Sequence, residues 1–128
     1  MQHKETKPTD GEMEILQVLW RKKKATVRDV YEIISERKEC GYTTTLKLMQ
    51  IMFEKKLVKR NESAKTHIYE ARVSKESMQK NLIDRMVDNV FQGSATGLVL
   101  QALGSAKPSS EELNKIQELL DQLKQENS

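Results

Sequence analysis

The sequence has little of what metal sites, disulfide frameworks and membrane spans require. It contains one cysteine and two histidines among 128 residues, which excludes a disulfide framework and a cysteine-rich zinc site. His3, Cys40 and His67 have no metal-ligand spacing, so we predict no metal and no cofactor. No run of about 18 apolar residues is present, which excludes a transmembrane helix. The first ten residues are polar and predict no secretory signal, so we expect a cytoplasmic protein without membrane insertion.

The sequence also lacks the residue combinations that are typical of catalytic sites. The chain shows no serine–histidine–aspartate arrangement, no stripe of paired acidic residues and no glycine-rich phosphate loop. These are the residue groups that supply nucleophiles, general acids and bases, and phosphate cradles in enzymes. We therefore expect that the protein is not an enzyme.

What the chain does have is charge, and the charge is unevenly distributed. Residues 1–73 carry 16 lysines and arginines against 11 acidic residues, whereas residues 74–128 carry 6 against 8. A basic region followed by a mildly acidic one is typical of a nucleic-acid-binding domain joined to a protein-binding region. An excess of this size also arises by ordinary scatter, so charge alone leaves both interpretations open. We place a domain boundary after Val73.

Capping signals and apolar periodicity predict three helices in the first 56 residues. Thr9 with Glu12, and Thr26 with Asp29, are spaced as capping boxes at the start of the first two. The third is expected to begin at Thr43, after a left-handed turn at Gly41. By helical spacing, the residues expected to face inward are Met13, Leu16, Leu19, Trp20, Val27, Val30, Ile33, Ile34, Thr45, Leu48, Met49, Met52 and Phe53.

Two strands follow the helices. Leu57–Arg60 and His67–Val73 have strand-like composition, and the polar turn Asn61–Thr66 separates them. Three helices followed by a β-hairpin is the layout of a mainly α, winged helix-turn-helix fold, in which the third helix enters the major groove of DNA. The candidate DNA-binding residues are the third-helix residues Tyr42, Thr43, Thr44, Thr45 and Lys47 and the wing residues Arg60 and Lys65.

Each of these candidates also has a structural interpretation. Threonines that open a helix are often caps, and Thr45 is also on the inward face. Lys47 alone is more typical of a solvated surface charge, and Arg60 and Lys65 are equally typical of ordinary residues beside a turn. The lysine run Lys22–Lys24 could hold phosphate, but it is more typical of a solvated helix end. The order of the elements favours the DNA-binding interpretation.

The remaining residues, 74–128, are predicted to be helical. A helix begins near Ser74 and ends at Gly93, a short apolar helix covers Leu98–Leu103, and residues 104–108 break the chain before a last helix that begins at Ser109 or Ser110. The last helix has a narrow apolar seam suited to pairing with another helix. We expect a dimerisation region, with an intrachain core as the alternative. Its expected contact residues are Leu98, Leu100, Leu103, Leu113, Ile116, Leu120 and Leu123.

Four segments resemble the penicillinase-repressor family of winged-helix regulators, in sequence order. They are Glu12–Trp20 (first helix), Gly41–Leu46 (start of the recognition helix), Glu54–Arg60 (exit into the wing) and Ile68–Ala71 (second wing strand). The resemblance extends over nearly the whole chain. Lys56 stands where the family usually has glycine, and the wing has Ala64 before Lys65 where a glycine is also usual.

The resemblance implies a homodimeric repressor acting on a palindromic operator. In that family a membrane-bound metalloprotease sensor triggers cleavage in the C-terminal region, and the matching bond here is Gln101–Ala102, where the resistance repressors have Asn–Phe. Copper-sensing relatives carry a cysteine motif near the C-terminus, and this chain has no cysteine after Cys40. The alternative function is a protein-binding winged-helix module that binds no DNA.

Overall fold

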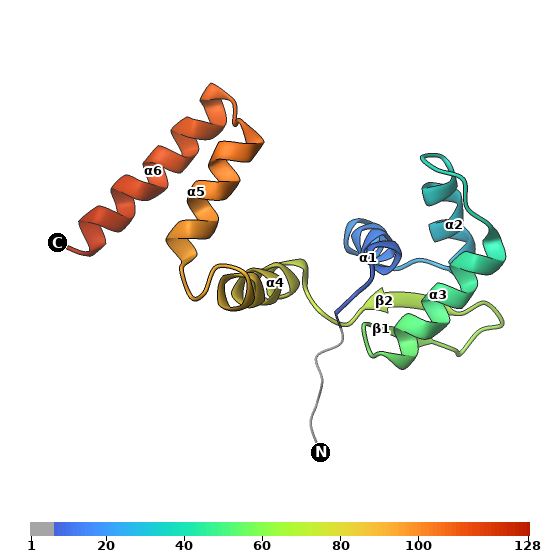
Figure 1. The fold of residues 1–128 in the computed structure, drawn as a ribbon. Coiled ribbons are helices and arrows are strands. Elements are labelled where there is room, and N and C mark those ends of the chain that lie inside the picture. The colour runs from blue at the N-terminus through green and yellow to red at the C-terminus, as the bar shows by residue number, and fades with distance from the viewer. Residues whose placement is uncertain (1–6) are drawn as a thin grey trace, which may run out of the picture. The chain divides into compact units, whose positions relative to one another are not determined.

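The computed structural model describes residues 7–128, which divide into two compact units (Figure 1). His3 and the rest of residues 1–6 lie outside the described residues. The first unit ends at Gln79, six residues beyond Val73, and includes the buried Met78. The helices and strands are α1 (Asp10–Lys22), α2 (Val27–Ser35), α3 (Tyr42–Glu54), β1 (Val58–Asn61), β2 (Ile68–Ala71), α4 (Lys75–Asn89), α5 (Ala95–Ala106) and α6 (Ser110–Glu126).

Both predicted capping boxes at the start of α1 and α2 are confirmed. The Thr9 hydroxyl accepts a hydrogen bond from the Glu12 amide at 3.2 Å, and the Glu12 carboxylate accepts one from the Thr9 amide at 2.9 Å. Thr26 and Asp29 make the same reciprocal pair, both at 3.1 Å. Each box satisfies amides that have no partner in the first turn of a helix.

The start of α3 differs from the prediction. Gly41 is its N-cap with φ −100° and ψ 154°, so it is extended and the expected left-handed turn is wrong. The helix begins at Tyr42, one residue earlier than expected, and no side chain caps it. The threonines that follow are therefore not needed as caps.

The wing is an antiparallel hairpin with Val58 opposite Ala71 and Asn61 opposite Ile68. Ala25, between α1 and α2, pairs with Tyr69 through hydrogen bonds of 3.1 and 2.8 Å, which ties the hairpin to the helices. The order helix, helix, helix, strand, strand with this pairing confirms the winged helix-turn-helix fold.

A single apolar core holds the first unit together. Its buried side chains come from all five elements and from the loops beside them: Ile15, Leu16, Val18, Leu19, Ala25, Val27, Val30, Ile34, Met49, Met52, Leu57, Val58 and Tyr69. Met13, Trp20, Ile33, Leu48 and Phe53, which were expected to face inward, are only half-buried. The Trp20 indole N–H instead reaches the edge of the core and donates to the Val73 carbonyl at 2.9 Å.

A tight backbone motif ends α3. The Lys56 amide donates to the Phe53 carbonyl at 3.1 Å, and the Leu57 amide donates to the Met52 carbonyl at 2.9 Å. This is the hydrogen-bond pattern of a Schellman motif, which requires a left-handed residue after the C-cap and usually has glycine there. Lys56 occupies that position with φ 66°.

The second unit is helical and has little core of its own. No residue of α5 or α6 is buried. Ser109 caps α6 in a third capping box, with Glu112. The expected break over residues 104–108 is too long, since α5 continues through Gly104 to Ala106 and ends at Lys107, with φ 50°. No helix in residues 7–128 is long and apolar enough to cross a membrane.

Candidate nucleic-acid interface

A concave surface lies between α3 and the wing. It has a volume of about 580 Å³ and is lined by Thr26, Val27, Arg28, Tyr42, Leu46, Gln50, Arg60, Lys65, Thr66, His67 and Tyr69. Three of these residues are cations and none is an aspartate or glutamate. A cationic concavity beside a helix suits the phosphates and groove edges of DNA.

The outward face of α3 carries short polar side chains and one cation. Tyr42, Thr43, Thr44 and Lys47 are exposed. Because Gly41 caps the helix without a side chain, the hydroxyls of Thr43 and Thr44 are not used for capping. Four of the five predicted α3 residues are thus presented to solvent at the start of the helix, where groove-reading helices make their contacts.

Thr45 lies in the core instead. It is 4% exposed and its hydroxyl donates to the Gly41 carbonyl at 3.1 Å. That hydroxyl therefore bonds back to the backbone of α3 one turn earlier, and the side chain is buried. The inward position follows from the same helical spacing that places Met49 and Met52 in the core.

Tyr42 belongs to an aromatic and cationic cluster. Its ring packs edge-on against Tyr31, with ring centroids 5.7 Å apart, and the Arg28 guanidinium lies 4.8 Å from the ring centroid. Arg28 was not predicted as a site residue. Its only signal in the sequence is a position two residues after the Thr26 cap, in the first turn of α2, whose amides also favour phosphate.

Arg60 is held by the wing. Its guanidinium lies 3.9 Å from the Phe53 ring centroid and its Nε donates to the Glu62 carboxylate. Hydrogen bonding to Tyr69 and Glu62 raises the pKa of Arg60, and the bond from Arg60 lowers the pKa of the Glu62 carboxyl. Glu62 therefore stays ionised at neutral pH and forms an ion pair with Arg60. Lys65, also on the wing, is exposed.

The expected dimerisation residues divide into two groups by exposure. Leu100 is 65% exposed, and Leu113, Leu120 and Leu123 are each 44–47% exposed. Leu98, Leu103 and Ile116 are half-buried. Such exposure is high for large apolar side chains, and contiguous apolar surface of this kind marks interaction sites.

The bond between Gln101 and Ala102 lies in the middle of α5. Both residues are exposed, and the Gln101 side-chain amide donates to the Ser105 hydroxyl at 3.3 Å, one turn later. Among residues 7–128 no group of three histidine, cysteine, aspartate or glutamate side chains is arranged to hold a metal ion.

Comparison with known proteins gives one family and a consistent set of relatives. The family model described as penicillinase repressor matches residues 8–122. The penicillinase repressor of Staphylococcus aureus is 18% identical over 123 residues, covering 96% of this chain and 98% of that protein. The methicillin resistance regulatory protein MecI of Staphylococcus aureus strain N315 is 22% identical over 121 residues, covering 94% and 98%.

Among solved structures, a variant of ZitR from Lactococcus lactis is similar with a TM-score of 0.49 and 17% sequence identity. The match covers 96% of this chain and 77% of that one.

Proposed function

The chain belongs to the penicillinase repressor family, and from this premise we propose that it is a homodimeric transcriptional repressor that binds a two-fold symmetric operator. The family membership supports repression and DNA binding. The single observation in the structure that carries the proposal is the cationic concavity between α3 and the wing.

In the proposed complex, α3 lies in the major groove of DNA. Thr43, Thr44 and Lys47, exposed near the start of α3, contact base edges, because threonine hydroxyls and methyls and the lysine ammonium suit groups displayed there. Tyr42 lies at the rim, supported by Tyr31. Thr45 supports the helix from within the core.

The phosphate contacts would come from the wing and from α2. Lys65 is exposed and can reach the backbone of the DNA, and Arg60 joins it when phosphate displaces Glu62. Arg28 adds a third cation from the same concavity. Contacts of this kind set affinity and register, whereas contacts to base edges set sequence preference.

The test is a triple variant, Lys47→Ala, Arg60→Ala and Lys65→Ala. We expect it to lose binding to the promoter fragment upstream of its own gene in a gel-shift assay. The logarithmic salt slope should also become shallower by about 0.9 for each phosphate that the variant no longer neutralises. The matched control replaces three exposed lysines that belong neither to α3 nor to the lining of the concavity, Lys75, Lys115 and Lys124.

The control variant has the same net charge as the triple variant and should bind as the wild type does. Equal binding by the triple variant and the wild type would contradict the site assignment. A wild-type chain that shifts no duplex would favour the protein-binding module instead.

Dimerisation is proposed to occur through α5 and α6 of a second copy. The support is the exposed apolar seam of Leu113, Leu120 and Leu123 on α6, a helix in which no residue is fully buried. Leu120→Asp with Leu123→Asp should convert the full chain from dimer to monomer in analytical ultracentrifugation. Gln122→Asp, an exposed polar site on the same helix, should leave the dimer intact. A monomeric wild type at micromolar concentration would contradict the proposal.

Release of repression is proposed to follow cleavage of the Gln101–Ala102 bond by a membrane-bound metalloprotease sensor. Both side chains are exposed, but the bond lies within the helix α5. This helix must therefore unwind locally before the bond can enter the active site of a protease. After induction, mass spectrometry should detect fragments that end at Gln101 and begin at Ala102. An intact chain under full derepression would contradict this route.

A further inference from the structure

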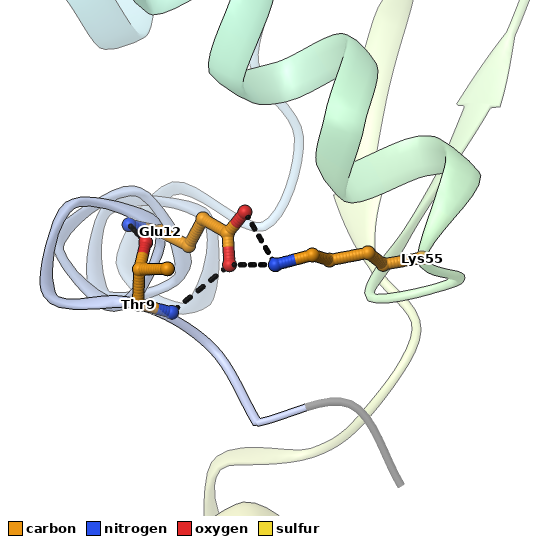
Figure 2. Close-up of polar contacts among 3 residues, drawn as sticks. All are labelled: Thr9, Glu12 and Lys55. Carbon is orange, nitrogen blue, oxygen red and sulfur yellow. Dashed lines mark hydrogen bonds and ion pairs between the residues drawn. The ribbon is translucent and has the colours of Figure 1, made fainter. Parts of the chain in front are cut away.

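A buried ion pair joins the start of α1 to the end of α3 (Figure 2). The Lys55 ammonium lies 2.9 and 3.0 Å from the two carboxylate oxygens of Glu12. The Glu12 side chain is 2% exposed and that of Lys55 is 26% exposed. The same carboxylate accepts a hydrogen bond from the Thr9 amide, so the capping box of α1 and the C-cap of α3 share one charged group.

The helix termini favour this placement of the two charges. Glu12 is in the first turn of α1, and Lys55 is the C-cap of α3. An anion is stabilised at a helix N-terminus and a cation at a C-terminus. The pair therefore holds the N-terminus of α1 against the C-terminus of α3, although the two residues are 43 positions apart in the chain.

The buried surface of α3 consists largely of adaptable side chains. Of the three buried residues of α3, two are methionines, Met49 and Met52. Methionine is unbranched and flexible and adapts to many arrangements, and apolar contact has no direction. A buried ion pair adds little net stability over an apolar pair, but it can fix register because its geometry is directional and an unpaired partner is costly.

The position of α3 matters for reading sequence. A helix rises 1.5 Å per residue, and successive base pairs are about 3.4 Å apart. A slip of α3 by one residue would thus displace Thr43, Thr44 and Lys47 by nearly half a base-pair step. Hydrogen bonds to base edges do not survive such a displacement, whereas flexible lysine contacts to phosphate can adjust.

We propose that Glu12 and Lys55 are positioning residues that fix α3 across the first unit and thereby set the sequence preference of DNA binding. The inference rests on the proposed function. The pair lies outside the concavity, so its proposed effect on specificity acts only through the position of α3.

The experiment compares full-length Glu12→Gln and Lys55→Gln with the wild type. Glutamine at position 12 keeps the capping box, since glutamine is also accepted there. Each variant is titrated against a duplex selected from a random pool by the wild type and against a scrambled duplex of equal length. Circular dichroism establishes that each variant is folded at the assay temperature, and Lys55→Arg, which keeps the cation, serves as the conservative rescue.

The exposed pair formed by Glu14 and Lys38 offers a matched control. It also joins α1 to a distant segment, at 2.6 Å, but its side chains are 33% and 51% exposed and neither belongs to α3. Glu14→Gln and Lys38→Gln make the same charge changes as the two test variants. Any change that comes from charge alone will appear equally in this pair.

We expect each test variant to lose about tenfold in affinity for the selected duplex, equivalent to about 1.4 kcal/mol, with little change for the scrambled duplex. The control variants and Lys55→Arg should keep the wild-type ratio of the two affinities. An unchanged ratio in folded Glu12→Gln and Lys55→Gln would overturn the inference, as would an equal loss for both duplexes. A wild type that selects no sequence would overturn the proposed function and this inference together.

Discussion

Replacing Lys56 with glycine should stabilise the first unit. Lys56 has φ 66° in the Schellman motif that ends α3. A residue with a Cβ loses about 1–2 kcal/mol in this left-handed region because the Cβ crowds its own carbonyl oxygen. Glycine avoids the clash, but it makes the unfolded chain more flexible, and this lowers the free energy of unfolding by about 0.5–1 kcal/mol. The net gain expected for Lys56→Gly is therefore about 0.5–1 kcal/mol.

The assay can report on the first unit alone. Trp20 is the sole tryptophan in the chain, and its indole donates to the Val73 carbonyl within that unit. Thermal unfolding followed by Trp20 fluorescence should show a rise in Tm of about 4 °C, given about 4–8 °C per kcal/mol for a unit of this size.

Lys56→Ala is the matched control, because it removes the same charge and keeps the Cβ. We expect its Tm to stay near the wild-type value or below it. Equal Tm values for the glycine and alanine variants would refute the argument that the backbone of Lys56 is strained.

Three further predictions concern the wing, the core and a cap. Glu62→Gln should raise DNA affinity several-fold in fluorescence anisotropy, because it weakens the hold on Arg60 and removes an anion from the wing; an unchanged affinity would argue that Arg60 does not reach phosphate. Thr45→Val should cost about 1 kcal/mol in urea unfolding yet keep the sequence preference of binding, and a variant without that preference would show that Thr45 reads DNA directly. Thr9→Ala should destabilise the first unit by about 1 kcal/mol because the helix cap is removed, and an unchanged Tm would contradict the role of the capping box.

Local features of the fold could be predicted from the sequence. The capping boxes at Thr9 and Thr26 depend on residues three positions apart, so their signal is complete within one turn. The hairpin and the order of the helices follow from periodicity and turn residues in the same way. The predicted helix break at Gly104 is wrong, because a glycine lowers helix propensity by only about 1 kcal/mol and surrounding residues can outweigh it.

Features that depend on distant residues could not be predicted. Glu12 was identified as part of a cap, but its partner Lys55 is 43 residues away and no periodicity connects them. Arg28 became a site residue only through its position over Tyr42. Thr45 shows that prediction was also limited within the site itself. Its helical spacing predicted a core residue, whereas its place in a run of threonines predicted a DNA-binding residue.

Dimerisation through the second unit, as proposed, would link the behaviour of the protein to its own abundance. Since α5 and α6 bury no residue within one chain, an assembly that covers their apolar surface would gain stability by mass action. At low copy number the proposed dimer would dissociate, and the separated chains would offer α5 to proteolysis whether or not an inducing signal is present. The repressor would then set a lower limit on its own working concentration, below which it is both released from DNA and degraded.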